Sequence, residues 1–178
     1  MSPLHEGYAA AIGRGLVVCQ HIESCAHHAG VVYAVTDALR DGVSDSTDLP
    51  GVAIRHRSAS LGRTIQRLEA SGDFERFGNA LQTGRNARNW LVHEAADVVG
   101  AAYSIQGVLE RVRQFREQVA ALCEADRILS VVSYEICERE PAPSTLSGIY
   151  AAKLAEWIMD PIINGIGSLA DSPSPGDS

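Results

Sequence analysis

Apolar residues recur at spacings of three and four over the longest patterned stretch of the chain, from about residue 101 to 138. The members of this series are Ile105, Val108, Leu109, Val112, Phe115, Val119, Leu122, Ile128, Leu129, Val132 and Ile136. This spacing places them on one side of a helix, so the pattern predicts a single long helix over 101–138. Pro141 and Pro143 follow it and are typical of the end of a helix.

The same spacing predicts helices over 15–40, 58–70, about 74–99 and 144–159. Residues 1–12 are expected to be a lead-in with a short helix of its own, and the polar residues 44–50 a loop. Gly30 and Gly84 are weak points inside two of these helices. Because no stretch alternates apolar and polar residues for long, the sequence predicts an all-α, up-and-down bundle of about five helices. The bundle is expected to form one domain over 1–170, followed by a disordered tail at 171–178.

The charge of the chain is unevenly distributed. The net charge is −7, yet residues 55–88 contain seven arginines against three acidic residues, a local excess of four positive charges. One basic patch on an acidic body suits an anionic ligand that binds at one place. The alternative is that these arginines cover helix surfaces and pair with acids elsewhere.

Compartment and membrane association follow from the cysteines and from the lengths of the apolar runs. The four cysteines, at 19, 25, 123 and 137, form no C-x-x-C pair, and the first residues lack the basic and apolar parts of a secretion signal. Reduced thiols in the cytoplasm are therefore expected. No apolar run reaches the roughly 18 residues that a membrane span needs, so no membrane partner is expected.

The strongest candidate for chemistry is the stretch from Arg85 to His93. In a helix Arg85, Asn89 and His93 share one face, with Arg88 beside them. An imidazole can move a proton near neutral pH, a guanidinium can hold a phosphate, and an amide can orient either group. These groups suit RNA cleavage without a metal, which uses the 2′-hydroxyl of the RNA as its nucleophile and needs no cofactor.

In that interpretation His93 transfers the proton, Arg88 clamps the phosphate, Asn89 orients them and Arg85 is a second cation. The structural alternative is that Arg88 pairs with Glu94 or another acid. Asn89 would then cap a helix broken at Gly84, and His93 would be an interface histidine.

A second group of chemically active side chains lies on the first long helix. His21, Cys25 and His28 have the spacing of metal ligands on one helix face, but no matching pair occurs elsewhere in the chain. A role in the core or at a dimer face is the preferred interpretation, and no metal site is predicted. Residues 55–57, Arg-His-Arg, are interpreted as the exposed basic start of a helix or as a phosphate contact.

The stretch Arg88-Asn89-Trp90-Leu91-Val92-His93 resembles the signature of the HEPN superfamily, R-x-x-x-x-H, commonly with Asn after the Arg. The segment before it is also similar, because HEPN-like proteins carry a Leu-Gly-x-x-Ile segment where this chain has Leu61, Gly62 and Ile65. The resemblance covers about residues 58–100.

This resemblance implies a HEPN-like helical bundle that forms a homodimer with a composite active site. It implies an endoribonuclease that acts as a toxin of a toxin–antitoxin pair or as an effector of phage defence, with an antitoxin or defence protein as partner. Arg88, Asn89 and His93 would be catalytic, and Arg85, Arg63 and Arg67 would contact RNA phosphates. Toxins paired with a nucleotidyltransferase often have Tyr two places after the His, where this chain has Ala95, which argues against that partner.

Two alternatives stay open. A catalytically inactive HEPN-like module would bind a protein partner or a nucleotide, and its sign would be a His93 buried behind Trp90. The second alternative is a different helical protein, such as a transcriptional regulator or a carrier domain, which would use neither Arg88 nor His93 for chemistry.

Overall fold

The computed structural model describes residues 2–42, 48–57, 59–70, 77–95 and 104–170. They form seven helices: α1 (Pro3–Arg40), α2 (Asp48–Arg57), α3 (Leu61–Ala70), α4 (Gly78–His93), α6 (Ile105–Glu138), α7 (Ser144–Ser147) and α8 (Tyr150–Ala170). No strand occurs in these ranges, so the predicted all-α class is confirmed. None of the described helices is both long and apolar enough to cross a bilayer.

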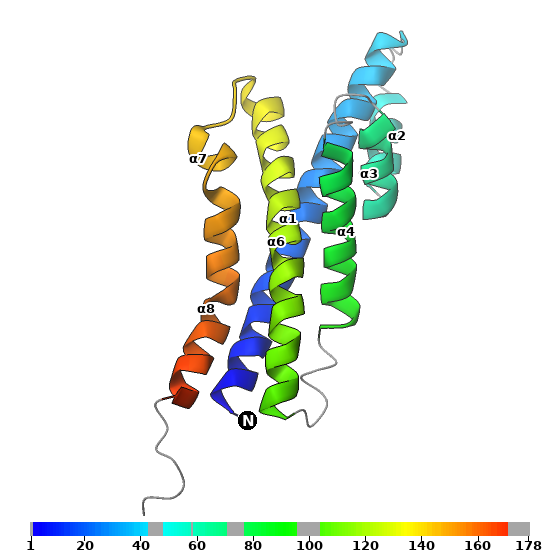
Figure 1. The fold of residues 1–178 in the computed structure, drawn as a ribbon. Coiled ribbons are helices and arrows are strands. Elements are labelled where there is room, and N and C mark those ends of the chain that lie inside the picture. Colours follow the sequence, from blue (N-terminus) through cyan, green and yellow to red (C-terminus); the bar gives the residue numbers. More distant parts are fainter. Residues whose placement is uncertain (1, 43–47, 58, 71–76, 96–103, 171–178) are drawn as a thin grey trace, which may run out of the picture.

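The core lies where the four longest helices run side by side. Figure 1 shows α1 and α6 at the centre, with α8 along one side and α4 with α2 and α3 on the other. Phe115 of α6 is fully buried, and its ring lies 5.2 Å from that of Tyr8 in α1 and 6.3 Å from that of Trp90 in α4. The apolar stripe of α6 therefore joins α1 to α4, the helix that carries the Arg-Asn-His stretch.

The first helix is longer than the sequence predicted. Residues 3–12 are not a separate lead-in but the first turns of α1. The side chain of Ser2 caps the helix by accepting a hydrogen bond from the backbone N–H of His5, and Pro3 occupies the first turn, where its missing N–H costs nothing. Tyr8 and Ala11 are buried there, so packing extends the helix beyond what its periodicity indicated. The helix also continues through Gly30.

The second helix was not predicted. Residues 48–50, expected to be loop, begin α2, while 43–47 lie outside the described residues. Residues 55–57 are the end of this helix rather than the start of one. Their basic side chains suit that position, because the last turn of a helix favours positive charge.

The C-terminal region contains two helices instead of the single helix predicted over 144–159. The short α7 ends before Gly148, and α8 continues through Pro161 to residue 170. A proline usually ends a helix. Here the carbonyl of Pro161 lies against Gly7 of α1, so close that a Cβ atom on Gly7 would sit 2.2 Å from that oxygen. Tight packing of α1 on α8 therefore supports the helix across the proline.

Two predicted helices are observed with shorter bounds. The helix expected over 74–99 is α4, and the one expected over 101–138 is α6. Residues 71–76, 96–103 and the predicted tail at 171–178 lie outside the described residues.

Gly84 is a packing position and not a weak point. The helix α4 is continuous across it, and a Cβ atom on Gly84 would lie 2.2 Å from the Cβ atom of Ala125 in α6. The absence of a side chain lets the two helices approach closely.

We expect Gly84→Ala to destabilise the protein by about 1–3 kcal/mol, because overpacking at the α4–α6 contact outweighs the gain in helix propensity. Gly13→Ala in α1 is the matched control, since nothing lies within 4 Å of its added methyl group. That control should be neutral or up to about 1 kcal/mol stabilising. Urea unfolding measures both, and equal effects would contradict the close contact.

Candidate functional site

Helix α4 presents the candidate residues on its flank because its other side is buried. The inward-facing residues are Leu81, Gly84, Ala87, Trp90 and Leu91. Arg85, Arg88 and Asn89 are half-buried beside this apolar stripe, and His93 in the last turn is exposed. The helical spacing therefore fixes which candidates face a neighbour and which face solvent.

Arg85, Arg88 and Asn89 line one pocket of about 400 Å³, which we call the Arg88 pocket. Its walls come from α1, from the segment that leads into α3, and from α4. The remaining lining residues are Glu23, His27, Ala59, Ser60, Leu61 and Gly62. The two halves of the sequence motif, 60–62 and 85–89, thus meet across the same space.

All three nitrogens of the Arg88 guanidinium donate hydrogen bonds. Its Nε donates a 2.8 Å hydrogen bond to Oε1 of Glu23 in α1, and its Nη2 donates to the same oxygen. Its Nη1 donates to Oδ1 of Asn89 at 3.2 Å. The pairing of Arg88 with an acid, which the structural alternative expected, is therefore observed, and the acid is Glu23 rather than Glu94. Only 26% of the Arg88 side chain is exposed, so this clamp fixes its direction.

Gly62 explains how Arg85 reaches the pocket. A Cβ atom on Gly62 would lie 2.8 Å from Cζ of Arg85, so the guanidinium rests over the bare backbone of the glycine. Arg85 Nη1 also donates to Oε1 of Gln82 at 3.5 Å. The glycine of the Leu-Gly-x-x-Ile segment therefore gives the second arginine its place.

The pocket carries a small excess of positive charge. Two arginines face one carboxylate, that of Glu23, which leaves one net positive charge when His27 is neutral. The Nε2–H of His27 donates to the carbonyl oxygen of Ala59 at 2.9 Å, which ties the segment before α3 to α1. A pocket with guanidinium N–H donors, the Ser60 hydroxyl and this charge suits one phosphate or carboxylate group.

His93 does not line the Arg88 pocket. It lies exposed one turn beyond Asn89, at the end of α4, whereas Trp90, three residues earlier on the same helix, is buried. The burial of His93 behind Trp90 that would mark a catalytically inactive module is therefore not observed. Asn89 does not cap a broken helix either, because α4 is continuous from Gly78 to His93.

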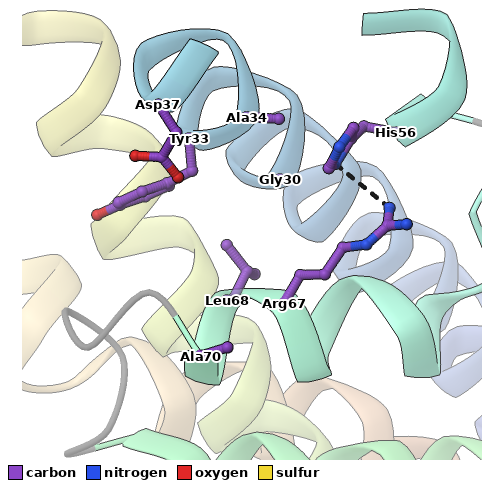
Figure 2. A pocket seen from close by; sticks show the side chains of 8 residues that line it. All are labelled: Gly30, Tyr33, Ala34, Asp37, His56, Arg67, Leu68 and Ala70. Carbon is purple, nitrogen blue, oxygen red and sulfur yellow. Dashed lines mark hydrogen bonds between the residues drawn. The ribbon is translucent and has the colours of Figure 1, made fainter. Parts of the chain in front are cut away.

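The two other predicted phosphate contacts lie elsewhere. Arg63 is exposed on α3 and is not among the residues that line the Arg88 pocket. Arg67 lines a second pocket of about 290 Å³ between α1, α2 and α3. Figure 2 shows Tyr33 and Asp37 on one side of this pocket and Arg67 with His56 on the other. The basic block of the sequence is thus divided between separate places.

Arg67 donates from Nη1 to Nδ1 of His56 at 3.3 Å. Burial, helped by the positive charges of Arg67 and Arg55, lowers the pKa of His56 below its ordinary value. The Nδ1 of a neutral imidazole can accept a hydrogen bond from a guanidinium N–H, which a protonated imidazole cannot. Burial and the contact with Arg67 therefore both favour the neutral form of His56.

A cluster that the sequence did not reveal lies around the buried carboxylate of Asp126 in α6. His21 Nδ1 is 2.7 Å from Asp126 Oδ1, and the hydroxyl of Tyr150 in α8 donates to Oδ2 at 2.7 Å. On its other side His21 Nε2 lies 3.4 Å from Sγ of Cys25. We call these four residues the Asp126 cluster. Within the described part of the chain, no group of three or more ligands is arranged to hold a metal ion.

The Asp126 cluster predicts a pH dependence of stability. The hydrogen bond to Asp126, followed by the one to Cys25, raises the pKa of His21 to about 10. The unfolded value is about 6.5, so the stabilising contribution is complete below that pH and is lost as the pH rises toward the folded pKa. We expect the free-energy difference between the parent and His21→Gln to shrink steadily over that window. A difference that is constant from pH 6 to pH 10 in urea unfolding would contradict this.

Comparison with known families, curated proteins and solved structures gives no match for this chain. Function is therefore inferred from the residues and their geometry.

Proposed function

We propose that the protein is a metal-independent endoribonuclease of the HEPN type that works as a homodimer. The observation that carries this proposal is that α4 holds phosphate-binding groups and a proton-transfer group at separate places. Arg88 and Asn89 are fixed with Arg85 on one pocket suited to a phosphate, while His93 on the same helix is open to solvent.

In the proposed reaction the 2′-hydroxyl of the RNA attacks the adjacent phosphorus, and His93 takes the proton of that hydroxyl. The P–O5′ bond breaks, a 2′,3′-cyclic phosphate forms, and the leaving 5′-oxygen receives a proton. Arg88 stabilises the negative charge that builds on the phosphoryl oxygens. Asn89 keeps the guanidinium in place through its Oδ1, and Arg85 adds a second positive charge at the rim.

The position of His93 is the reason for proposing a dimer. Within one chain His93 is not part of the Arg88 pocket. One imidazole also supplies only one of the two proton transfers, so the second needs the histidine of another copy or a water molecule. A composite site formed by two α4 helices would bring the His93 of one copy to the Arg88 pocket of the other. The biological setting, a toxin–antitoxin pair or phage defence with an antitoxin or defence protein as partner in the cytoplasm, follows from the resemblance to HEPN proteins.

Glu23 sets how strongly the pocket attracts RNA. It holds Arg88 but also neutralises part of its charge, so a phosphate competes with this carboxylate for the guanidinium. This arrangement favours an orienting contact over tight binding, in agreement with the small net charge of the pocket.

The test is RNA cleavage in excess EDTA by the purified protein beside His93→Ala. We expect the variant to lose roughly 10²–10⁴-fold in rate, the usual contribution of a positioned acid or base. His28→Ala is the matched control, because His28 is an exposed histidine of α1 and does not line the Arg88 pocket. Retained cleavage by His93→Ala would overturn the proposed role.

A second candidate function, a nucleotide-binding or protein-binding module without catalysis, is favoured by the Glu23–Arg88 pair. An arginine that is already paired can bind a phosphate without any nearby proton-transfer group. In that case the parent binds RNA or nucleotides in EDTA without cleaving them. Arg85→Ala then weakens binding and reduces its salt dependence by about one unit of slope.

A further inference from the structure

We propose that Cys25 is a nucleophilic thiol that undergoes exchange with low-molecular-weight disulfides, activated by His21 and oriented through Asp126. This site lies on the side of α1 that faces α6 and α8, and the ribonuclease proposal does not use it.

The geometry is that of a nucleophile, an imidazole and an orienting carboxylate in series. Cys25 Sγ lies 3.4 Å from His21 Nε2, and His21 Nδ1 lies 2.7 Å from Asp126 Oδ1. A thiol within reach of an imidazole that is itself held by a third group is the arrangement by which proteins activate cysteines.

Asp126 is placed to hold this series rigidly. Its side chain is 1% exposed, and both carboxylate oxygens are occupied, one by His21 and the other by the hydroxyl of Tyr150. The side chain of His21 is 50% exposed and that of Cys25 is partly exposed, so the reactive end of the series opens to solvent. A buried carboxylate behind an accessible imidazole and thiol leaves the sulfur within reach of a small reagent.

The series places a positive charge beside the sulfur of Cys25. The carboxylate of Asp126 raises the pKa of His21, so the imidazole is protonated near neutral pH and its Nε2–H points at sulfur. The other titratable groups near Asp126, Tyr150 of α8, Cys123 of α6 and Cys19 of α1, are protonated at that pH because burial raises the pKa of each. His21 is therefore the one cation in the cluster, and it lies beside Cys25.

The place of Cys25 in the fold selects the reaction. It lies in the middle of α1, where the backbone N–H groups are engaged within the helix and offer no oxyanion hole for acyl transfer. Disulfide exchange needs none. The Cys25 thiolate attacks one sulfur of R–S–S–R, a new S–S bond forms to Cys25, and the old S–S bond breaks. Cys25 is oxidised, and the departing RS⁻ leaves as the reduced thiol with a proton from His21 or water.

The other cysteines of the chain are internal controls. Cys137 is exposed and its Sγ lies 3.4 Å from Nε2 of His28, a contact that matches the one made by Cys25. Unlike His21, His28 forms no ion pair with a carboxylate among the described residues. Cys19 and Cys123 are buried, and burial raises the pKa of both thiols to about 12, so their modification reports unfolding.

The test exposes the native protein to oxidised glutathione and follows the modification of each cysteine by peptide mass spectrometry. We expect Cys25 to react roughly tenfold faster than Cys137 at neutral pH. Below neutral pH the rate at Cys137 should fall about tenfold per pH unit while that at Cys25 falls much less. Accessibility alone cannot produce this difference in pH dependence.

His21→Gln is expected to remove the excess rate at Cys25 and to give it the pH profile of Cys137. Tyr150→Phe retains His21 and Asp126 and should keep most of the excess. Unmodified Cys19 and Cys123 confirm that each variant is folded. Equal rates and equal pH profiles at Cys25 and Cys137 in the parent, or an unchanged Cys25 rate in folded His21→Gln, would overturn the proposal.

Discussion

Replacing Arg88 with alanine is expected to lower the rate of RNA cleavage by roughly 10²–10³-fold, the usual loss when one preorganised donor to the transition-state charge is removed. The guanidinium is fixed by Glu23 and Asn89 before RNA arrives, so it needs no reorganisation during the reaction. The fold should survive, because Arg88 and Glu23 are both partly exposed and water can solvate the carboxylate that remains. Initial rates on a labelled RNA in EDTA measure the effect.

Two further arginine variants sharpen this prediction. Arg88→Lys keeps the charge but not the planar fork that binds Glu23 and Asn89 together, so its rate should fall between those of the parent and the alanine variant. Arg113→Ala removes an exposed arginine of α6 that is not part of the Arg88 pocket and should leave the rate unchanged. Equal losses for Arg88→Ala and Arg113→Ala would mean that overall charge, and not the pocket, determines cleavage.

Phe115→Ala is expected to reduce the free energy of unfolding by about 3–5 kcal/mol. The ring of Phe115 is fully buried and contacts the rings of Tyr8 and Trp90, so its removal opens a cavity where α1, α4 and α6 meet. Aromatic pairs also contribute beyond the area that they bury. Urea unfolding followed by circular dichroism measures the loss.

Ile163→Ala serves as the control for this effect. Ile163 is an apolar residue of α8 whose side chain is largely exposed, and its truncation should cost less than about 0.5 kcal/mol. A small effect of Phe115→Ala, close to that of the control, would contradict the close packing of α4 on α6.

The sequence predicted helices well where one apolar stripe runs without interruption, and less well where contacts between distant segments decide. The helix α6 is close to its predicted bounds because its apolar residues keep one spacing throughout. The extension of α1 to Pro3 and the passage of α8 through Pro161 depend on the fit of Gly7 against α8. Such a fit leaves no local pattern, so periodicity alone cannot find it.

The candidate site shows the same division. The helical spacing correctly placed Arg85 near Arg88 and Asn89, because all three lie on one helix. The partner Glu23 is 65 residues away and was not predicted. Asp126 is recognisable in the sequence as a charged residue between Leu122 and Leu129 on the apolar stripe of α6. A charge at such a position requires hydrogen-bond partners, which here are His21 and Tyr150.

The clustering of arginines in the sequence did not predict where their side chains lie in the fold. The basic block predicted one patch, but Arg63 is exposed on α3, Arg67 contacts His56 in the second pocket, and Arg85 lies in the Arg88 pocket. A charge count over a stretch of sequence does not show where each side chain points. These arginines lie on different helices and point in different directions.

The central claim, a composite ribonuclease site, is tested most directly by mixing two inactive variants. Arg88→Ala and His93→Ala proteins are unfolded together and refolded, so that mixed dimers form, and RNA cleavage is measured in excess EDTA beside each variant alone. If one copy supplies Arg88 and the other His93, a mixed dimer contains one intact site, and the mixture regains a clear fraction of the parental rate. A mixture as inactive as its components, or a folded parent that leaves RNA uncut, would contradict the claim.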